Sequence, residues 1–291
     1  MRKLEQEERQ RQWLAKHCPP HPRLPDPTCT VCGAQMPYVV TYDRWRAPLF
    51  LCHEHLPDWA AYELENGPDD RMCNLYSVTT NQEAIRDLAR YTRDMVGNMP
   101  PIPAVFPDRM APVVRTAPDG VRELVLMRWG FPPRPPFPGS KTNNRPITNV
   151  RNTSSRYWAP WLKNPARRCL VPVTSFAEPD NNQGPKSIWT WFARDESRPL
   201  MFFAGLWREW DGRRGTKADP VTGTHLLFSF LTTDASHDVA PVHSDATPVC
   251  LFTEDEREMW MNAPVEMALS LQRPPAPGAL RVVATDTKQD G

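Results

Sequence analysis

The chain has 291 residues, of which 40% are hydrophobic, and its formal net charge is only +1. This length fits one large domain, or a medium domain with a small appendage. No apolar run approaches the roughly 18 residues of a membrane span, and the N-terminal stretch is too polar for a signal peptide, so a cytoplasmic protein is expected. Seven cysteines, an odd number, favour thiols or metal ligands over a secreted disulfide framework.

A metal site is predicted over residues 29–55, after a charged helix at the N-terminus and a proline-rich turn. A CxxC, Cys29 and Cys32, and a CxxH, Cys52 and His55, bracket two short strand-like runs. Four ligands at this spacing are typical of a structural zinc ribbon, and the alternative is a set of incidental buried cysteines. We expect structural zinc here and no cofactor for catalysis. The substitute ligands would be Cys18, His21 and His53.

The composition changes at Met72, after the acidic linker ELENGPDDR. We therefore predict an N-terminal extension over residues 1–71 and a main domain over residues 72–288. The main domain opens with MCNLYSVTT, which is typical of a strand that leads into a helix.

An amphipathic helix is predicted over residues 81–96. Thr80 and Glu83 have the spacing of a capping box, the following apolar residues fall on one helical face, and Gly97 supplies a stop. A second capping box, in TEDE, predicts a helix through EREMWMNA.

Short β-rich runs separated by turns fill most of the remaining chain. They are APVVRT, VRELVLMRW, RCLVPV, SIWTWFA, LMFFAGLW, HLLFSFLTT, PVCLF and ALRVVAT. The proline clusters PPIPAVFP and FPPRPPFPG are interpreted as rigid loops within the fold. The predicted class is α+β: a mostly antiparallel, β-rich sheet or barrel with a few helices, plus the small zinc-ribbon-like segment.

Positive charge is concentrated in one part of the chain. Residues 109–168 are rich in Lys and Arg and contain only Asp119 and Glu123 as acids, whereas acidic residues slightly outnumber basic ones over residues 1–71. Aromatic residues are interleaved with the positive charges, a combination that suits phosphates and unpaired bases. The alternative is a solvated basic face over buried aromatic residues.

Five blocks carry a resemblance to a known family. They are MCNLYS, KTNNRPITNVRN, RCLVPVTSFAEP, FAGLWREW and PVHSDATPVCL, in that order, from Met72 nearly to the C-terminus. On these blocks the chain resembles the SRAP (SOS-response-associated peptidase) family. The resemblance implies a compact β-rich fold with a basic groove, a partner that is single-stranded DNA with abasic sites, and a place in the bacterial cytosol or nucleoid. Nothing indicates a membrane or an obligate protein partner, so we expect a monomer.

The resemblance also implies roles for five residues. Cys73 would be the nucleophile, Glu178 would assist opening of the sugar ring and reversal of the crosslink, and His243 would position or protonate a Schiff-base intermediate. Asn149 and Arg151, two apart on an extended segment, would hold the abasic sugar and its phosphate. Weaker candidates for the DNA groove are Arg128, Trp129 and Asp234. The histidines expected to be structural are His225 and His237.

The implied chemistry needs a terminal cysteine, whereas Cys73 is internal. The amine and thiol of a terminal cysteine can close on the aldehyde of an abasic site, first as a Schiff base and then as a thiazolidine, with an acid and a base to move protons. An amide nitrogen cannot start this reaction. Three explanations stay open: translation from Met72 with a wrongly joined upstream segment, which we favour by a modest margin; cleavage of the bond between Met72 and Cys73; or a true fusion whose crosslinking is weakened or lost.

Two positions depart from the family pattern around the expected site. Pro179 replaces a bulky aromatic residue after Glu178, and an acidic Asp245 follows His243 where members commonly have a basic stretch before proline. A carboxylate there would be unfavourable near phosphates. The residues that follow His243 are Ser244, Asp245, Ala246 and Thr247.

Two other functions remain as alternatives. One is a cysteine peptidase or amidohydrolase, with Cys73 as nucleophile, His243 as base and Asn149 as the orienting group. The other is a non-catalytic binder of single-stranded DNA, for which Cys73→Ala would leave binding intact. The basic segment favours DNA over a peptide substrate.

Overall fold

The structure is a computed structural model, and the residues that it describes are 39–42, 48–51, 75–133, 146–180, 188–215 and 219–290. The predicted N-terminal helix, the four predicted zinc ligands and Cys73 lie outside these residues. Contacts divide the chain into two units. The described part of the first is a hairpin of β1 (Val39–Tyr42) and β2 (Pro48–Leu51), and the second holds every described residue from Leu75 onward.

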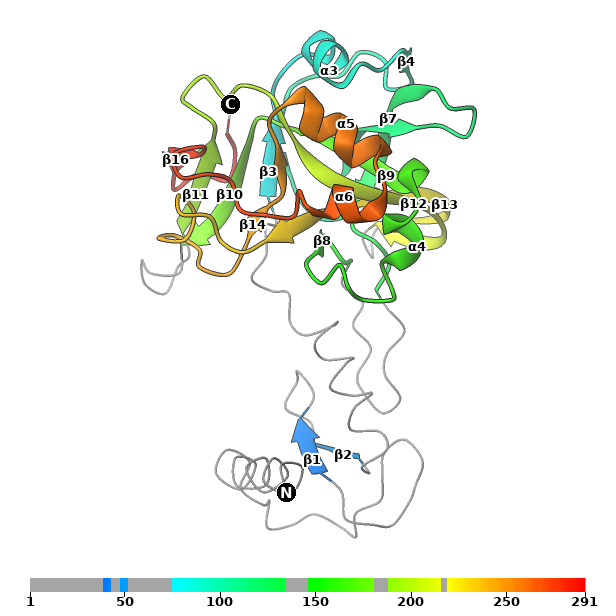
Figure 1. Cartoon of the computed structure of the whole chain (residues 1–291), viewed down its shortest axis with the longest axis vertical. Coiled ribbons are helices and arrows are strands. Elements are labelled where there is room, and N and C mark those ends of the chain that lie inside the picture. The colour runs from blue at the N-terminus through cyan, green and yellow to red at the C-terminus, as the bar shows by residue number, and fades with distance from the viewer. Residues whose placement is uncertain are drawn as a thin grey trace. The chain divides into compact units, whose positions relative to one another are not determined.

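The second unit contains a five-stranded antiparallel sheet in the order β16–β11–β10–β3–β5 (Figure 1). Its strands are β3 (Leu75–Val78), β5 (Ile102–Val105), β10 (Ser175–Asp180), β11 (Ile188–Ala193) and β16 (Arg281–Thr285). The segment PPIPAVFP, predicted as a loop, contains β5. This prediction was wrong because an edge strand tolerates prolines, which lack the N–H that a central strand would need.

A nine-stranded sheet follows the order β14–β13–β12–β9–β6–β7–β4, with β15 beside β12 and β8 beside β13. Its longer strands are β6 (Met110–Thr116), β7 (Arg122–Trp129), β9 (Arg168–Val173), β12 (Met201–Gly215) and β13 (Pro220–Thr233). Its short strands are β4 (Arg93–Asp94), β8 (Asn149–Val150), β14 (Thr247–Pro248) and β15 (Cys250–Leu251).

A parallel pairing between β13 and β7 closes five strands of this sheet, β13, β12, β9, β6 and β7, into a barrel. Strand β13 also pairs in parallel with β8, and β4 with β7. The predicted β-rich fold with few helices is therefore confirmed, and of the two larger sheets the nine-stranded one is mixed, whereas the five-stranded one is antiparallel.

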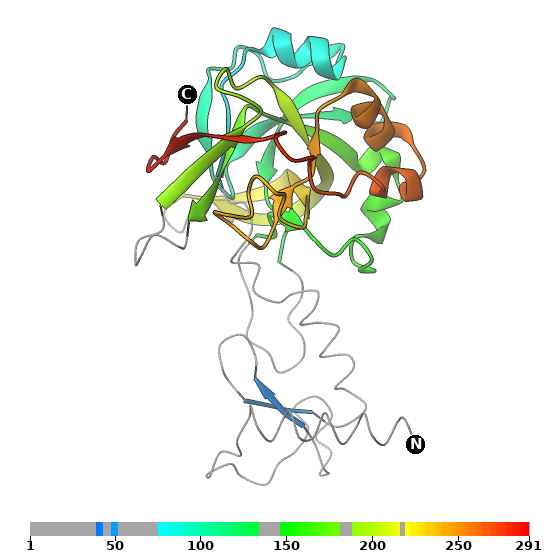
Figure 2. The ribbon, with the colours of Figure 1, turned by 60° about the vertical axis from the view of Figure 1, so that its left-hand side comes forward.

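The helices pack around the strands (Figure 2). They are α3 (Gln82–Ala89), α4 (Ala159–Leu162), α5 (Glu254–Asn262) and α6 (Val265–Leu269), with a 3-10 turn, η1, at Pro165–Arg167. The capping box predicted for α5 is confirmed: Glu256 accepts from the backbone N–H of Thr253, and the Thr253 hydroxyl accepts from that of Glu256. Helix α5 contacts β9 and β12, so it covers part of the barrel.

The helix predicted over residues 81–96 is shorter than expected. Asn81, rather than Thr80, caps α3 by accepting from the N–H of Ala84, and the helix ends at Arg90 in the left-handed region, with φ of 52°. Beyond it, β4 pairs with β7, so the backbone finds its hydrogen bonds in the sheet. The predicted end of the helix was wrong because the pairing of β4 with β7 competes with a continued helix.

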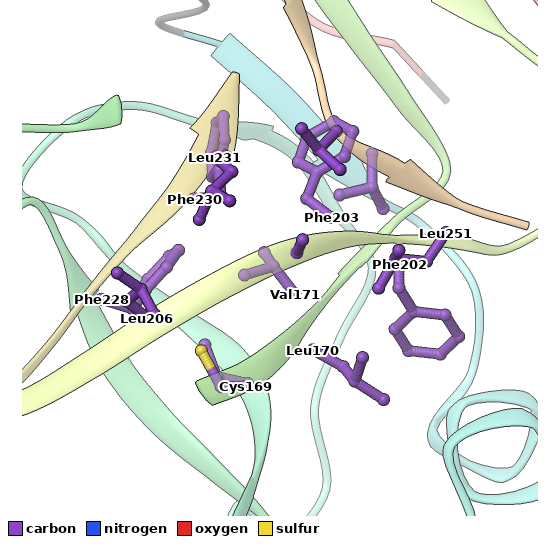
Figure 3. Close-up of a cluster of buried hydrophobic side chains, with 14 of the residues drawn as sticks. Cys169, Leu170, Val171, Phe202, Phe203, Leu206, Phe228, Phe230, Leu231 and Leu251 are labelled. Atoms are coloured by element: carbon purple, nitrogen blue, oxygen red, sulfur yellow. The ribbon is translucent and has the colours of Figure 1, made fainter. Parts of the chain in front are cut away.

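Buried aromatic and aliphatic side chains pack on both faces of strands β9 and β12 (Figure 3). Tyr76 meets Trp129 edge to face with ring centroids 5.1 Å apart, and Phe230 stacks on Trp129 at 5.2 Å. Strands β9 and β12 approach so closely that a Cβ at Gly205 would lie 2.6 Å from the Cys169 sulfur. This packing fixes the strands on which the candidate site is built.

Candidate active site

The structure brings Glu178 and His243 together. Glu178 lies on β10, and His243 lies on the loop between β13 and β14; their side chains are 0% and 2% exposed. The distance between His243 Nε2 and Glu178 Oε2 is 3.9 Å. An imidazole and a carboxylate at this distance are close enough to interact electrostatically, which is the arrangement that general acid–base chemistry needs.

The start of strand β3 lies directly beside this pair. In the antiparallel pairing of β3 with β10, Leu75 is the partner of Ala177, the residue before Glu178. Leu75 is also two positions after Cys73 in the sequence. The sheet therefore places the chain that follows Cys73 next to the strand that carries the buried carboxylate.

The loop over residues 234–246, here called the His243 loop, is fixed at its base by short pairings. Thr233 pairs with Thr247 across β13 and β14. The hydroxyl of Thr247 accepts from the backbone N–H of Ser236 at 2.9 Å, and the N–H of His243 donates to the carbonyl of Val239 at 2.9 Å. The backbone that carries the imidazole is thus held within the loop.

Asp238 anchors the same loop to the C-terminal part of the chain. Its carboxylate accepts from the backbone N–H groups of Gly278 and Leu280, at 2.9 and 3.0 Å. Burial alone would raise the pKa of Asp238, but these donors, together with the neighbouring His237, outweigh burial and lower the pKa below its usual range. The carboxylate therefore stays ionised near neutral pH and keeps both bonds.

Asn149 begins β8 and Arg151 directly follows it, and the two side chains differ in exposure. Asn149 is 2% exposed and its Nδ2 donates to the hydroxyl of Thr148 at 2.9 Å. The side chain of Arg151 is 38% exposed. Its guanidinium donates to the carbonyls of Thr233, directly before the His243 loop, and of Asp245, near the end of that loop.

Asp234 forms an ion pair with Arg151, at 2.5 Å between Oδ1 and Nη2, and its side chain is 84% exposed. Asp245, which was expected to disfavour phosphates, contributes its backbone carbonyl to the same guanidinium at 3.2 Å. Arg151 thus binds the protein as well as facing solvent.

The two weaker groove candidates, Arg128 and Trp129, occupy packing positions. Trp129 is 0% exposed and its Nε1 donates to the carbonyl of Thr148 at 3.0 Å. Arg128 donates to the carbonyl of Asp108 at 2.5 Å, and one of its nitrogens is 3.7 Å from that residue's carboxylate. In this arrangement Trp129 supports the segment that leads to Asn149, and it presents no ring face for a base.

Much of the positive charge over residues 109–168 is used inside the protein. Arg115 binds Glu123 at 2.8 Å, and Arg122 binds Glu258 at 2.6 Å. The aromatic residues of that segment pack on one another, as Phe131 does with Trp158 at 5.5 Å. For these residues the structure supports the alternative interpretation, in which basic side chains lie over buried aromatic residues.

The remaining histidines and cysteines of interest are placed away from solvent or in simple contacts. Nε2 of His225, on β13, lies 3.2 Å from the carbonyl of Val221, whereas the side chain of His237 is 77% exposed beside Asp238. Cys169 and Cys250 are buried, and burial raises the pKa of both thiols. Neither cysteine has the thiolate character that a nucleophile needs at neutral pH.

Fold and site together define a β-rich protein with a five-stranded barrel, a buried carboxylate–imidazole pair, and a strand start beside that pair. A family model described as SOS response associated peptidase (SRAP) matches residues 72–288, and the chain belongs to this family. Residues 1–71 precede the match as an N-terminal extension. Family membership implies processing of abasic sites in DNA or crosslinking to them, and the family name describes a peptidase.

Two solved structures from Bordetella bronchiseptica share the fold. One protein is 21% identical with a TM-score of 0.54, and the similarity covers 74% of this chain and 98% of that chain. The other, a phage-related protein, is 20% identical with a TM-score of 0.50, covering 73% of this chain and 92% of that chain. No curated protein matches the chain.

Proposed function

We propose that the protein joins itself covalently to abasic sites in single-stranded DNA through Cys73. The observation that carries the proposal is the buried pair of Glu178 and His243, 3.9 Å apart, beside the strand that begins two positions after Cys73. Cys73 itself lies outside the described residues, so its place in the site is part of the proposal.

Chain connectivity supports a nucleophile in this place. Leu75 pairs with Ala177, adjacent to Glu178. Two residues of extended chain span at most about 7 Å. The chain length therefore allows Cys73 to reach the carboxylate, and the proposal takes it to do so.

The proposed reaction is balanced without an oxidant or a reductant. The amine of a terminal Cys73 adds to the aldehyde carbon of the ring-opened sugar, and loss of water gives an imine. The thiol sulfur then bonds to the imine carbon and the nitrogen takes up a proton, which closes a thiazolidine. Glu178 would serve the proton transfers of ring opening and of crosslink reversal, and His243 those of the imine.

A free amine at Cys73 is a condition of this chemistry. Hydrolysis of the bond between Met72 and Cys73 would supply it, because water then leaves a carboxylate on Met72 and an amine on Cys73. Removal of Met72 from a chain translated from that residue would have the same result. The family name favours the first route as an activity of the protein, and mass analysis separates the two.

Recognition of the DNA is assigned to Asn149 and to Arg151. Asn149 would bind the abasic sugar, and the partly exposed guanidinium of Arg151 would bind a neighbouring phosphate. Each phosphate contact adds to the salt dependence of binding. A salt titration of affinity for single-stranded DNA is therefore expected to show a steep fall, and a flat response would remove the DNA groove from the proposal.

The decisive experiment is intact-mass analysis of the purified full chain before and after incubation with abasic single-stranded DNA, made from a uracil-containing oligonucleotide with uracil glycosylase. We expect a heat-stable adduct on a chain that begins at Cys73. The absence of an adduct, even on a chain expressed from Met72 and freed of its methionine, would refute the proposal. It would favour a cysteine peptidase or a non-catalytic binder of single-stranded DNA.

Matched variants assign the roles within the site. Glu178→Gln and His243→Gln are expected to slow adduct formation, because each removes a proton donor or acceptor. Glu83→Gln changes an exposed glutamate away from the His243 loop, so it is expected to react like the wild type. Equal rates in all three variants would exclude the buried pair from the chemistry.

A further inference from the structure

Gln272 lies after α6, and its side-chain amide joins two segments that are distant in sequence. Nε2 donates to the carbonyls of Arg151 and Thr232, both at 2.9 Å, and Oε1 accepts from the hydroxyl of Thr153 at 2.7 Å. The two amide hydrogens and the amide oxygen are therefore all engaged. A glutamine bound in this way holds its partners in one fixed arrangement.

The two carbonyls stand where a strand pairing ends. Strands β8 and β13 run in parallel, and Val150 with Leu231 is the last pair of their ladder. Arg151 and Thr232 are the next residue on each strand. The amide of Gln272 thus continues the connection between the two segments beyond the point where backbone pairing stops.

Both segments lead into the candidate site. From Arg151, the guanidinium reaches the carbonyls of Thr233, directly before the His243 loop, and of Asp245, near its end. From Thr232, the chain passes through Thr233 into that loop. A chain of contacts thus links Gln272 to the loop that carries the imidazole.

We propose that Gln272 is a positioning residue, which sets the backbone of Arg151 and the His243 loop and so the geometry of the Glu178–His243 pair. This inference rests on the proposed function. Gln272→Glu tests it with almost no change of shape, because a carboxylate has no N–H and would face two carbonyl oxygens. Gln272→Leu is the second variant; it removes the donors without adding a charge.

A matched control exists elsewhere in the chain. Gln82 on α3 also bridges two groups: its Nε2 donates to the carboxylate of Asp94 at 3.0 Å, and its Oε1 accepts from the N–H of Met99 at 3.0 Å. Gln82→Glu is therefore expected to lower stability without changing the site. A merely structural glutamine at 272 would behave in the same way.

The experiment compares wild type, the two Gln272 variants and Gln82→Glu as full chains. The readouts are the single-turnover rate of adduct formation at saturating abasic DNA, the dissociation constant for DNA, the melting temperature, and the imidazole NMR resonances of His243. We expect both Gln272 variants to lose at least about tenfold in rate (about 1.4 kcal/mol) and to shift the His243 resonances, while Gln82→Glu changes neither.

Unchanged His243 resonances in the folded Gln272 variants would overturn the inference, as would a wild-type rate. If the wild type itself forms no adduct, the proposed function fails, and the NMR comparison still decides whether Gln272 sets the position of His243. The two failures are thus distinguishable.

Discussion

Arg168 offers the sharpest test of how the fold is held together, because its guanidinium is wholly buried and binds backbone carbonyls. Nε and Nη2 donate to the carbonyl of Leu162, at 3.1 and 2.8 Å, and Nη1 donates to those of Trp260 and Ala263, at 3.0 and 2.6 Å. These carbonyls lie at the C-terminal ends of α4 and α5, where helical carbonyls have no intrahelical partner and the helix dipole is negative. One side chain thus caps two helices.

The magnitude of the effect of Arg168→Met follows from these contacts. Three buried carbonyls lose their donor, and each such group costs about 1–3 kcal/mol. Part of this is offset because methionine carries no charge that must be desolvated; burial already lowers the pKa of Arg168 from its ordinary value. We therefore expect a loss of about 3–5 kcal/mol in the free energy of unfolding.

Urea denaturation followed by tryptophan fluorescence measures this loss. The melting temperature should fall by about 2–4 °C for each kcal/mol of lost stability. Arg156→Met is the matched control, because Arg156 is exposed and a surface change of this kind stays within about 0.5 kcal/mol. A loss below about 1 kcal/mol for Arg168→Met, indistinguishable from the control, would refute the account of Arg168 as a shared helix cap.

Three further predictions concern other parts of the chain. Burial would raise the pKa of Asp290, but hydrogen bonds from Arg198 and Ser175 lower it. This carboxylate thus stabilises the fold at pH values above its unfolded pKa of about 3.9, and the stabilisation is lost as pH falls through the lower folded pKa. In urea denaturation, Asp290→Asn should lower the free energy of unfolding at pH 7 and lower it far less near pH 2. Equal losses at the two pH values would contradict this. Gly205→Ala should lower the free energy of unfolding by about 1–3 kcal/mol, because the added Cβ would meet the Cys169 sulfur. An unchanged melting temperature would argue against so close an approach of the two strands. Metal analysis of the full chain should find about one zinc, lost in Cys29→Ala, if the predicted ribbon forms; a zinc-free wild type would reject the ribbon.

Sequence patterns were most informative where burial and local turn chemistry decide the structure. The runs APVVRT and RCLVPV form β6 and β9, and the capping box at Thr253 opens α5. Such signals are local, since alternation of apolar residues and a cap are both complete within a few positions. They predicted strand identity well without revealing which strands would pair.

The misses share a cause, which is competition from partners distant in sequence. Helix α3 stops at Arg90 because the following residues pair with β7, and the prolines near Ile102 are accommodated in the edge strand β5. The parallel pairing of β13 with β7, which closes the barrel, has no local signature. Local propensity cannot predict an outcome that depends on a partner 30 positions away, as for Arg93 with Glu123, or 99 positions away, as for Leu227 with Arg128.

The candidate site was found by resemblance, and its geometry was not visible in the sequence. Glu178 and His243 came from the family blocks, and only the folded chain places them 3.9 Å apart. Gln272 had no signal at all, because an isolated glutamine after a short helix is an ordinary surface residue. Its importance follows only from the three bonds that its amide makes.

The separation within the buried pair bears on how the site would act. At 3.9 Å, Nε2 of the imidazole and Oε2 of the carboxylate are beyond the 2.7–3.2 Å range typical of a hydrogen bond. The proposed reaction asks for two proton transfers on different atoms, one at the opening sugar and one at the imine. A pair held close by β10 on one side and by the His243 loop on the other can serve both transfers. On this proposal the contacts that Arg151 and Asp238 make with the loop, and the bonds by which Gln272 holds the backbone of Arg151, would matter to catalysis as much as the pair itself, because they would set that separation.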